Sequence, residues 1–101
     1  MPIYMTARFK VKPESLDKCQ QAIREFIDYI KENEPDTRLY ESVQEAADAT
    51  SFLHYFIFEN EAARNKHQSS DGVKRFTGIL YPELLVPVEF TEYTLIASTE
   101  T

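Results

Sequence analysis

The strand-like segment Ser51–Glu59 most constrains the fold, because hydrophobic side chains occupy both of its faces. Its alternating positions form two sets: Phe52, His54, Phe56 and Phe58 on one face, and Leu53, Tyr55 and Ile57 on the other. A strand in a small antiparallel sheet normally exposes one face to water. We therefore expect helices to cover one face of the sheet and a second copy of the chain to cover the other.

The composition fits one domain covering residues 1–101, which at 43% hydrophobic residues can bury a thin core. A net charge of −6 with scattered basic residues argues against a nucleic-acid partner. No apolar run reaches the roughly 20 residues of a membrane span, and no signal peptide is recognised. We therefore expect a cytoplasmic protein without a membrane partner. The single Cys19 cannot form an intrachain disulfide.

The first half of the chain predicts a strand, a helix and a second strand. Residues Ile3–Val11 alternate with period two, which is typical of a strand. Hydrophobic residues then recur with helical spacing: Leu16, Cys19, Ile23, Phe26, Ile27 and Ile30. We expect this helix to begin after Ser15 as N-cap and to end near Glu32, before Pro35. Within this stripe, Cys19 is expected to be a buried hydrophobe rather than a reactive thiol.

The second half completes an α+β pattern. Strands are predicted at Thr37–Gln44, Ser51–Glu59 and Val88–Ala97, and helices at Glu61–Gln68, capped by Asn60, and from Ser70 or Asp71 onward. The order strand, helix, strand, strand, helix, strand is the ferredoxin-like βαββαβ pattern. It predicts a four-stranded antiparallel sheet with helices on one face, whose bare face meets its copy in a homodimer.

Short segments along nearly the whole chain carry a family resemblance, in this order: Ala7–Pro13, Glu34–Pro35, Leu39–Glu41, Phe52–Phe58, Glu59–Ala63, His67 with Ser70, Phe76, and Pro87–Glu89. They resemble the antibiotic biosynthesis monooxygenase domain, a group of dimeric α+β barrels. The resemblance implies a homodimer with face-to-face sheets and a pocket between sheet and helices in each subunit. It also implies oxidation of phenolic or quinol substrates by O2 without metal or flavin. The commonest family form has a second histidine where this chain has Gly72.

In the family pattern Ala7 faces the pocket. The neighbouring third strand should then turn its matching face to the same side, and this face carries Phe52, His54, Phe56 and Phe58. On this assignment His54 is a polar group in an aromatic chamber, where desolvation keeps it neutral and able to accept a proton. His54 is therefore a candidate catalytic base. The alternative is a structural histidine that is hydrogen-bonded to a neighbouring carbonyl or tyrosine.

The other candidate residues surround the same chamber. His67, near the end of a short helix, is the second catalytic candidate, and the alternative is a solvated helix residue. Because there is no third histidine and Cys19 lies on another element, we expect no metal site. Candidate substrate-binding residues are the tyrosines and the aromatic wall: Tyr40, Tyr81, Phe52, Phe56, Phe58 and Phe76.

Three functions are consistent with these residues. The first is a cofactor-independent monooxygenase that oxidises a small aromatic or quinol-type substrate with O2. The second is a non-catalytic dimer that binds a small hydrophobic or aromatic ligand. The third is an isomerase or another proton-transfer enzyme of the same fold. The fold alone does not decide among them.

Overall fold

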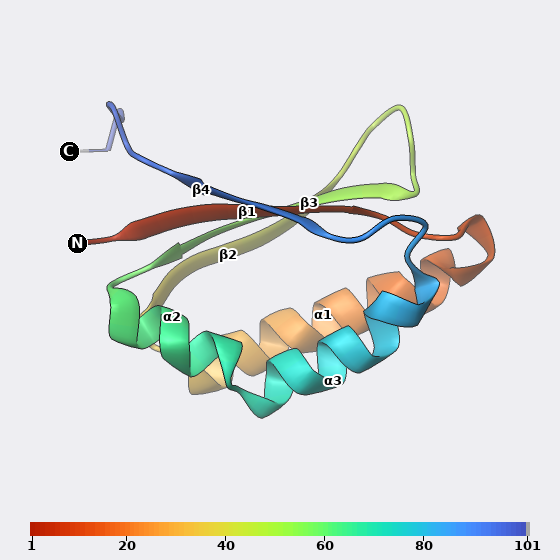
Figure 1. Ribbon diagram of the computed structural model, residues 1–101, viewed down its shortest axis with the longest axis horizontal. Helices are drawn as coiled ribbons and strands as arrows, with labels where there is room; N and C mark the ends of the chain where they lie inside the picture. The colour runs from red at the N-terminus through yellow and green to blue at the C-terminus, as the bar shows by residue number, and fades with distance from the viewer. Residues whose placement is uncertain (101) are drawn as a thin grey trace.

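The computed structural model describes residues 1–100 and has one sheet with all three helices on one of its faces (Figure 1). The strands lie in the order β2-β3-β1-β4, and every neighbouring pair is antiparallel. The elements are β1 (Ile3–Lys10), α1 (Leu16–Asn33), β2 (Thr37–Gln44), β3 (Ser51–Phe58), α2 (Glu61–Gln68), α3 (Asp71–Leu80) and β4 (Glu89–Tyr93). Short 3-10 turns at Pro13–Ser15 and Tyr81–Glu83 flank the helical segments. The ferredoxin-like α+β fold is confirmed.

The register of β1 and β3 fixes which side chains face the helices. Ala7 pairs with His54, and Phe9 pairs with Phe52. Burial along β3 alternates strictly, with the set that contains Phe52 and His54 buried and the set that contains Tyr55 half-buried. The predicted assignment of the two faces of β3 is therefore confirmed.

Side-chain caps begin the two C-terminal helices. The Asn60 side chain accepts a hydrogen bond from the Ala63 backbone N–H at 2.9 Å, as predicted, and Ser70 does the same for Val73 at 3.1 Å. Ser15 is the N-cap residue of α1, as predicted, but its side chain makes no capping hydrogen bond, because its hydroxyl donates to the Glu83 carboxylate instead.

The last strand is shorter than the predicted Val88–Ala97. β4 ends at Tyr93, which lies opposite Tyr4 on β1. In the same antiparallel register Leu95 would lie opposite Pro2, which has no N–H to donate. The strand thus ends where its partner can no longer continue the ladder.

The core lies between the sheet and helices α1 and α3. Cys19 is fully buried in it, and burial raises the pKa of its thiol, as expected for an apolar core residue. Helices α1 and α3 approach closely at Gly72. A Cβ atom built there would lie 2.2 Å from the Tyr29 ring. A side chain such as the second histidine of the commonest family form therefore has no room at this position.

The opposite face of the sheet has no covering element among residues 1–100. Leu53, Tyr55 and Ile57 are only half-buried there, and Val43 is 52% exposed. This face is the hydrophobic one that the sequence predicts. None of the helices described combines the length and the hydrophobicity that a membrane crossing requires.

Candidate functional site

A cavity of about 450 Å³ lies between the sheet and the helices. Its walls are mostly hydrophobic and aromatic: Met5, Ala7, Phe9, Phe26, Tyr40, His54, Phe56, Phe58, His67, Gln68, Val73, Phe76, Thr77, Leu80, Tyr81, Val88 and Phe90. Every predicted site residue lines it except Phe52, which packs in the core against Phe9 with ring centroids 5.4 Å apart. A concave, largely apolar chamber with a few polar groups is typical of a small-molecule site.

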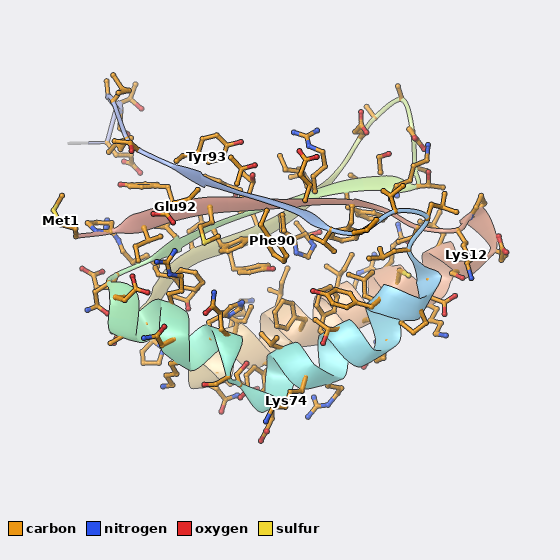
Figure 2. All side chains as sticks on the ribbon, viewed as in Figure 1. Met1, Lys12, Lys74, Phe90, Glu92 and Tyr93 are labelled. Carbon is orange, nitrogen blue, oxygen red and sulfur yellow. The ribbon has the colours of Figure 1, made fainter. Side chains whose placement is uncertain are left out.

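Two exposed aromatic rings line the cavity, one on β4 and one just after α3. Figure 2 shows Phe90 pointing from β4 into the space above the helices, whereas Tyr93 lies on the other side of the sheet. Phe90 is 57% exposed and Tyr81 is 48% exposed, although both line the cavity. These two rings therefore form an aromatic rim. The sequence predicts Tyr81 as a site residue but not Phe90, because the strand that carries Phe90 alternates too weakly to show which face meets the helices.

His54 lies at the sheet wall of the cavity, paired with Tyr40 on β2. The Tyr40 hydroxyl is 2.8 Å from Nδ1 of His54. His54 is 1% exposed, and burial lowers its pKa to about 4, so the imidazole is neutral near pH 7. Its Nε2 has no hydrogen-bond partner within residues 1–100. The structural alternative, a histidine bonded to a tyrosine, matches this geometry.

His67 lies on α2 at the other polar edge of the cavity. Its Nδ1 is 2.8 Å from Oε1 of Glu34, and its ring lies 5.1 Å from the Phe58 ring, centroid to centroid. The side chain is buried at 7% exposure. The alternative of a solvated helix residue is therefore wrong.

Glu34 follows the last turn of α1 and is itself buried at 4% exposure. Burial alone would raise the pKa of Glu34, but hydrogen bonds from His67 and from the Thr37 hydroxyl outweigh burial and lower it. Glu34 is thus a carboxylate that accepts the Nδ1 proton of His67. This leaves Nε2 as the nitrogen of His67 that can exchange a proton with a ligand.

Two further contacts fix the position of α2 and therefore of His67. Asn60 caps the helix, and Arg64 pairs with Glu92 on β4 through an Nη1–Oε1 distance of 2.9 Å. Figure 2 labels Glu92 near the end of the sheet that lies over α2. The helix that carries His67 is thus held at its N-terminus and at its middle.

Glu34 is a site residue that the sequence-based prediction does not include, although the sequence carries a signal for it. It lies four residues after Ile30 and so continues the apolar stripe of α1. A carboxylate on a buried face needs a hydrogen-bonded partner, and His67 is that partner. Residues 1–100 place no group of three His, Cys, Asp or Glu side chains where it could hold a metal ion.

The site therefore offers two distinct polar groups in one aromatic chamber. One is a histidine oriented by a carboxylate, an arrangement suited to general base catalysis. The other is a neutral histidine held by a tyrosine. Tyr40 lies between them, with ring centroids 5.3 Å from His54 and 5.7 Å from His67. Both histidines line the same cavity.

Solved structures share this fold along nearly the whole chain. A protein from Bacteroides thetaiotaomicron, named after the antibiotic biosynthesis monooxygenases, superimposes with a TM-score of 0.90 at 18% identity, covering 99% of this chain and 94% of that one. A protein from Mycobacterium tuberculosis superimposes with a TM-score of 0.88 at 17% identity, covering 99% and 100%. At these identities the likeness shows the fold alone.

Two sequence comparisons give closer relationships. Human N-terminal EF-hand calcium-binding protein 3 is 32% identical over 89 residues, which are 88% of this chain. The chain spans only 22% of that protein's length. The model of the antibiotic biosynthesis monooxygenase family matches residues 2–78, which include β1, both histidines, Glu34 and Tyr40. The chain therefore belongs to the antibiotic biosynthesis monooxygenase family.

Proposed function

We propose that the chain is a monooxygenase that needs no cofactor and oxidises a small aromatic or quinol-type substrate with O2 in this cavity. The observation that carries the proposal is the buried Glu34–His67 pair at the wall of an aromatic chamber. The substrate's anion is electron-rich enough to reduce O2, so the protein needs to bind it, remove a proton and limit access of water. Membership of the family supports the same reaction class.

His67 is the base in this proposal. Its Nε2 accepts the substrate proton, and the Glu34 carboxylate stabilises the imidazolium that forms. His54 is less suited to this task, because burial holds its pKa at about 4 and Tyr40 already engages its Nδ1. These contacts support His67 as the base rather than His54, which the sequence puts forward first.

The reaction balances without an external reductant. For an anthrone-type methylene, two C–H bonds are lost, one oxygen atom becomes the new C=O, and the other leaves as water with the two hydrogens. The four electrons that reduce O2 come from the substrate carbon. One O2 is therefore consumed for each substrate molecule.

We also propose that the chain acts as a homodimer through its open sheet faces. Half-buried Leu53, Tyr55 and Ile57 form a hydrophobic strip there, and Leu95 and Ile96 beyond β4 are 50% and 91% exposed. Burying hydrophobic surface of this kind is favourable. Since the cavity lies on the opposite side of the sheet, each subunit keeps its own site.

The deciding experiment is oxygen consumption by purified, chelator-treated protein with anthrone-type phenols and quinols. Uptake above the uncatalysed rate, one O2 per product, and its loss in His67→Gln would support the oxygenase. Asn65→Gln, on the exposed side of the same helix, is the matched control. Deuterium exchange at the substrate carbon without oxygen uptake would instead indicate a proton-transfer enzyme. Saturable binding with neither reaction would indicate a ligand-binding protein.

A further inference from the structure

The His54–Tyr40 pair has no role in the proton transfer assigned to His67, yet it holds a buried polar atom without a partner. We propose that His54 presents its Nε2–H to a carbonyl oxygen of the ligand, and that Tyr40 is the positioning residue that fixes this tautomer. The site would then select flat aromatic ketones or quinone-type compounds over hydrocarbons of the same shape. This inference rests on the cavity as the ligand site but not on oxidation.

The tautomer of His54 follows from the number of donors and acceptors that each arrangement leaves unpaired. Tyr40 has a single hydrogen-bond partner in the described part of the chain, Nδ1 of His54 at 2.8 Å. If Tyr40 donates to Nδ1, only the Nε2–H remains without a partner. If Nδ1–H donates to the hydroxyl instead, both the Tyr40 hydroxyl proton and the Nε2 lone pair remain unpaired. The first arrangement leaves fewer buried groups unsatisfied and is therefore favoured.

The surroundings of Tyr40 support the same direction of donation. Burial is the main cause that raises the pKa of Tyr40, and the nearby Glu34 carboxylate raises it further. The phenol therefore keeps its proton and acts as the donor. His54 is held neutral by burial, so its Nδ1 has a free lone pair with which to accept.

In this tautomer the Nε2–H of His54 is a buried donor that lacks a hydrogen-bond acceptor within residues 1–100. Buried polar groups in folded proteins are almost always hydrogen-bonded, yet Nε2 of His54 has no partner in the described residues, and His54 lines the cavity. We take a ligand in the cavity to be the missing partner. The His54 ring is held edge-on by Phe9 at 4.9 Å and faces Phe76 at 5.9 Å between ring centroids. Neither aromatic ring supplies an acceptor oxygen. A carbonyl on a flat aromatic ligand has the needed oxygen and fits between such rings.

Two properties of the ligand follow from the two histidines. Its carbonyl end meets His54, and its acidic proton faces His67. A site that hydrogen-bonds a substrate atom discriminates strongly against an analogue that lacks it, because the protein group is then left unpaired. The cavity offers hydrophobic contacts to any aromatic compound, and the hydrogen bond adds selectivity for compounds with a carbonyl group.

The first test observes the tautomer directly. A long-range proton–nitrogen NMR spectrum of the uniformly ¹⁵N-labelled wild-type protein at pH 7 distinguishes the two neutral forms of His54. We expect the Nε2–H form, and a mixture of tautomers in Tyr40→Phe. A wild-type spectrum with the proton on Nδ1 would overturn the proposal without recourse to any variant.

The second test measures binding of two matched probes, 9-fluorenone and fluorene, by calorimetry or fluorescence. Hydrophobicity alone favours fluorene, which lacks the carbonyl, so a preference for fluorenone reports the hydrogen bond. We expect about a tenfold preference in the wild type. It should disappear in His54→Asn, which keeps a partner for Tyr40 but removes Nε2. Tyr55→Phe, on the opposite face of the sheet, should retain it.

Equal binding of the two probes, or a preference that survives in His54→Asn, would overturn the proposal. Because neither probe is oxidised, the result is independent of oxygen uptake. A fluorenone preference in a protein that consumes no O2 would support this inference while contradicting the proposed oxygenase. Oxygen uptake without a fluorenone preference would support the proposed oxygenase and contradict the role of His54.

Discussion

Nδ1 of His67 lies 2.8 Å from Oε1 of Glu34, and this contact joins α2 to the end of α1. The two residues are 33 positions apart in the chain, and both are buried. A buried carboxylate beside an imidazole orients the ring and stabilises its protonated form. The pair therefore makes Glu34 a residue whose removal tests the function without removing the base.

Replacing Glu34 with Gln should lower oxygen consumption by about a hundredfold, a typical loss for impaired general base catalysis. The amide preserves the size of the side chain but cannot compensate the charge on a protonated His67. Initial rates with a saturating quinol, measured with an oxygen electrode, give the effect on turnover. Glu32→Gln, on the exposed side of the same helix end, is the control and should stay near wild-type activity. Equal rates in Glu34→Gln and wild type would exclude this role.

As the pH falls, protonation of His54 should destabilise the fold at a higher pH than protonation of Glu34 does. The folded-state pKa of His54 is about 4, against an ordinary 6.5, so between these values the unfolded chain binds a proton that the folded chain does not. Stability is therefore complete above pH 6.5 and falls as the pH drops, by about 1.4 kcal/mol per unit and roughly 3 kcal/mol in all. The lowered pKa of Glu34 acts in the same direction, but only below its ordinary value of 4.5.

Urea unfolding of wild type and His54→Asn at several pH values between 7 and 4.5 measures this effect. The variant lacks the titrating ring, so the difference in unfolding free energy between the two proteins should shrink as the pH falls. A difference that stays constant across this range would show that His54 is not held neutral by the fold.

Much of the fold could be predicted from the sequence because its patterns are local. The alternation along β3 separates its residues into two faces, and the helical spacing of α1 identifies the stripe that packs on the sheet. Which face of β3 meets the helices followed from the family resemblance, because both faces are hydrophobic. The end of β4 could not be predicted in this way, since it depends on where β1 stops offering partners. When the end of a strand depends on its neighbour in the sheet, the residues of the strand itself do not indicate where it ends.

The candidate site was predicted in part for the same reason. Periodicity groups aromatic residues such as Phe56 on one face of their element, and the family resemblance directs that face toward a pocket. The partner of His67 could not be predicted in this way, because Glu34 reaches it only after α1 and α2 have packed on the sheet. The roles of the two histidines likewise depend on which nitrogen each neighbour engages.

A charge on the open face of the sheet should separate the subunits of the proposed dimer. Wild type should have about twice the single-chain mass of 11.8 kDa by light scattering at micromolar concentration. Ile57→Lys should shift this mass toward one chain, because two lysines would be buried against each other across the interface. Ala62→Lys, on the exposed face of α2, should not change the mass. A wild-type mass near 11.8 kDa would contradict the dimer.

The two glycines of α3 should respond to alanine in opposite directions. At Gly72 a Cβ would lie 2.2 Å from the Tyr29 ring, so α1 and α3 must move apart, at a cost of about 1–3 kcal/mol. At Gly78 a Cβ meets no atom within 4 Å, and alanine should stabilise the exposed helix by about 0.5–1 kcal/mol. Thermal unfolding of the two variants beside wild type measures both. Since each substitution adds the same methyl to the same helix, helix propensity alone predicts stabilisation in both. A stabilised Gly72→Ala would therefore show that α1 and α3 do not pack as closely as this structure has them.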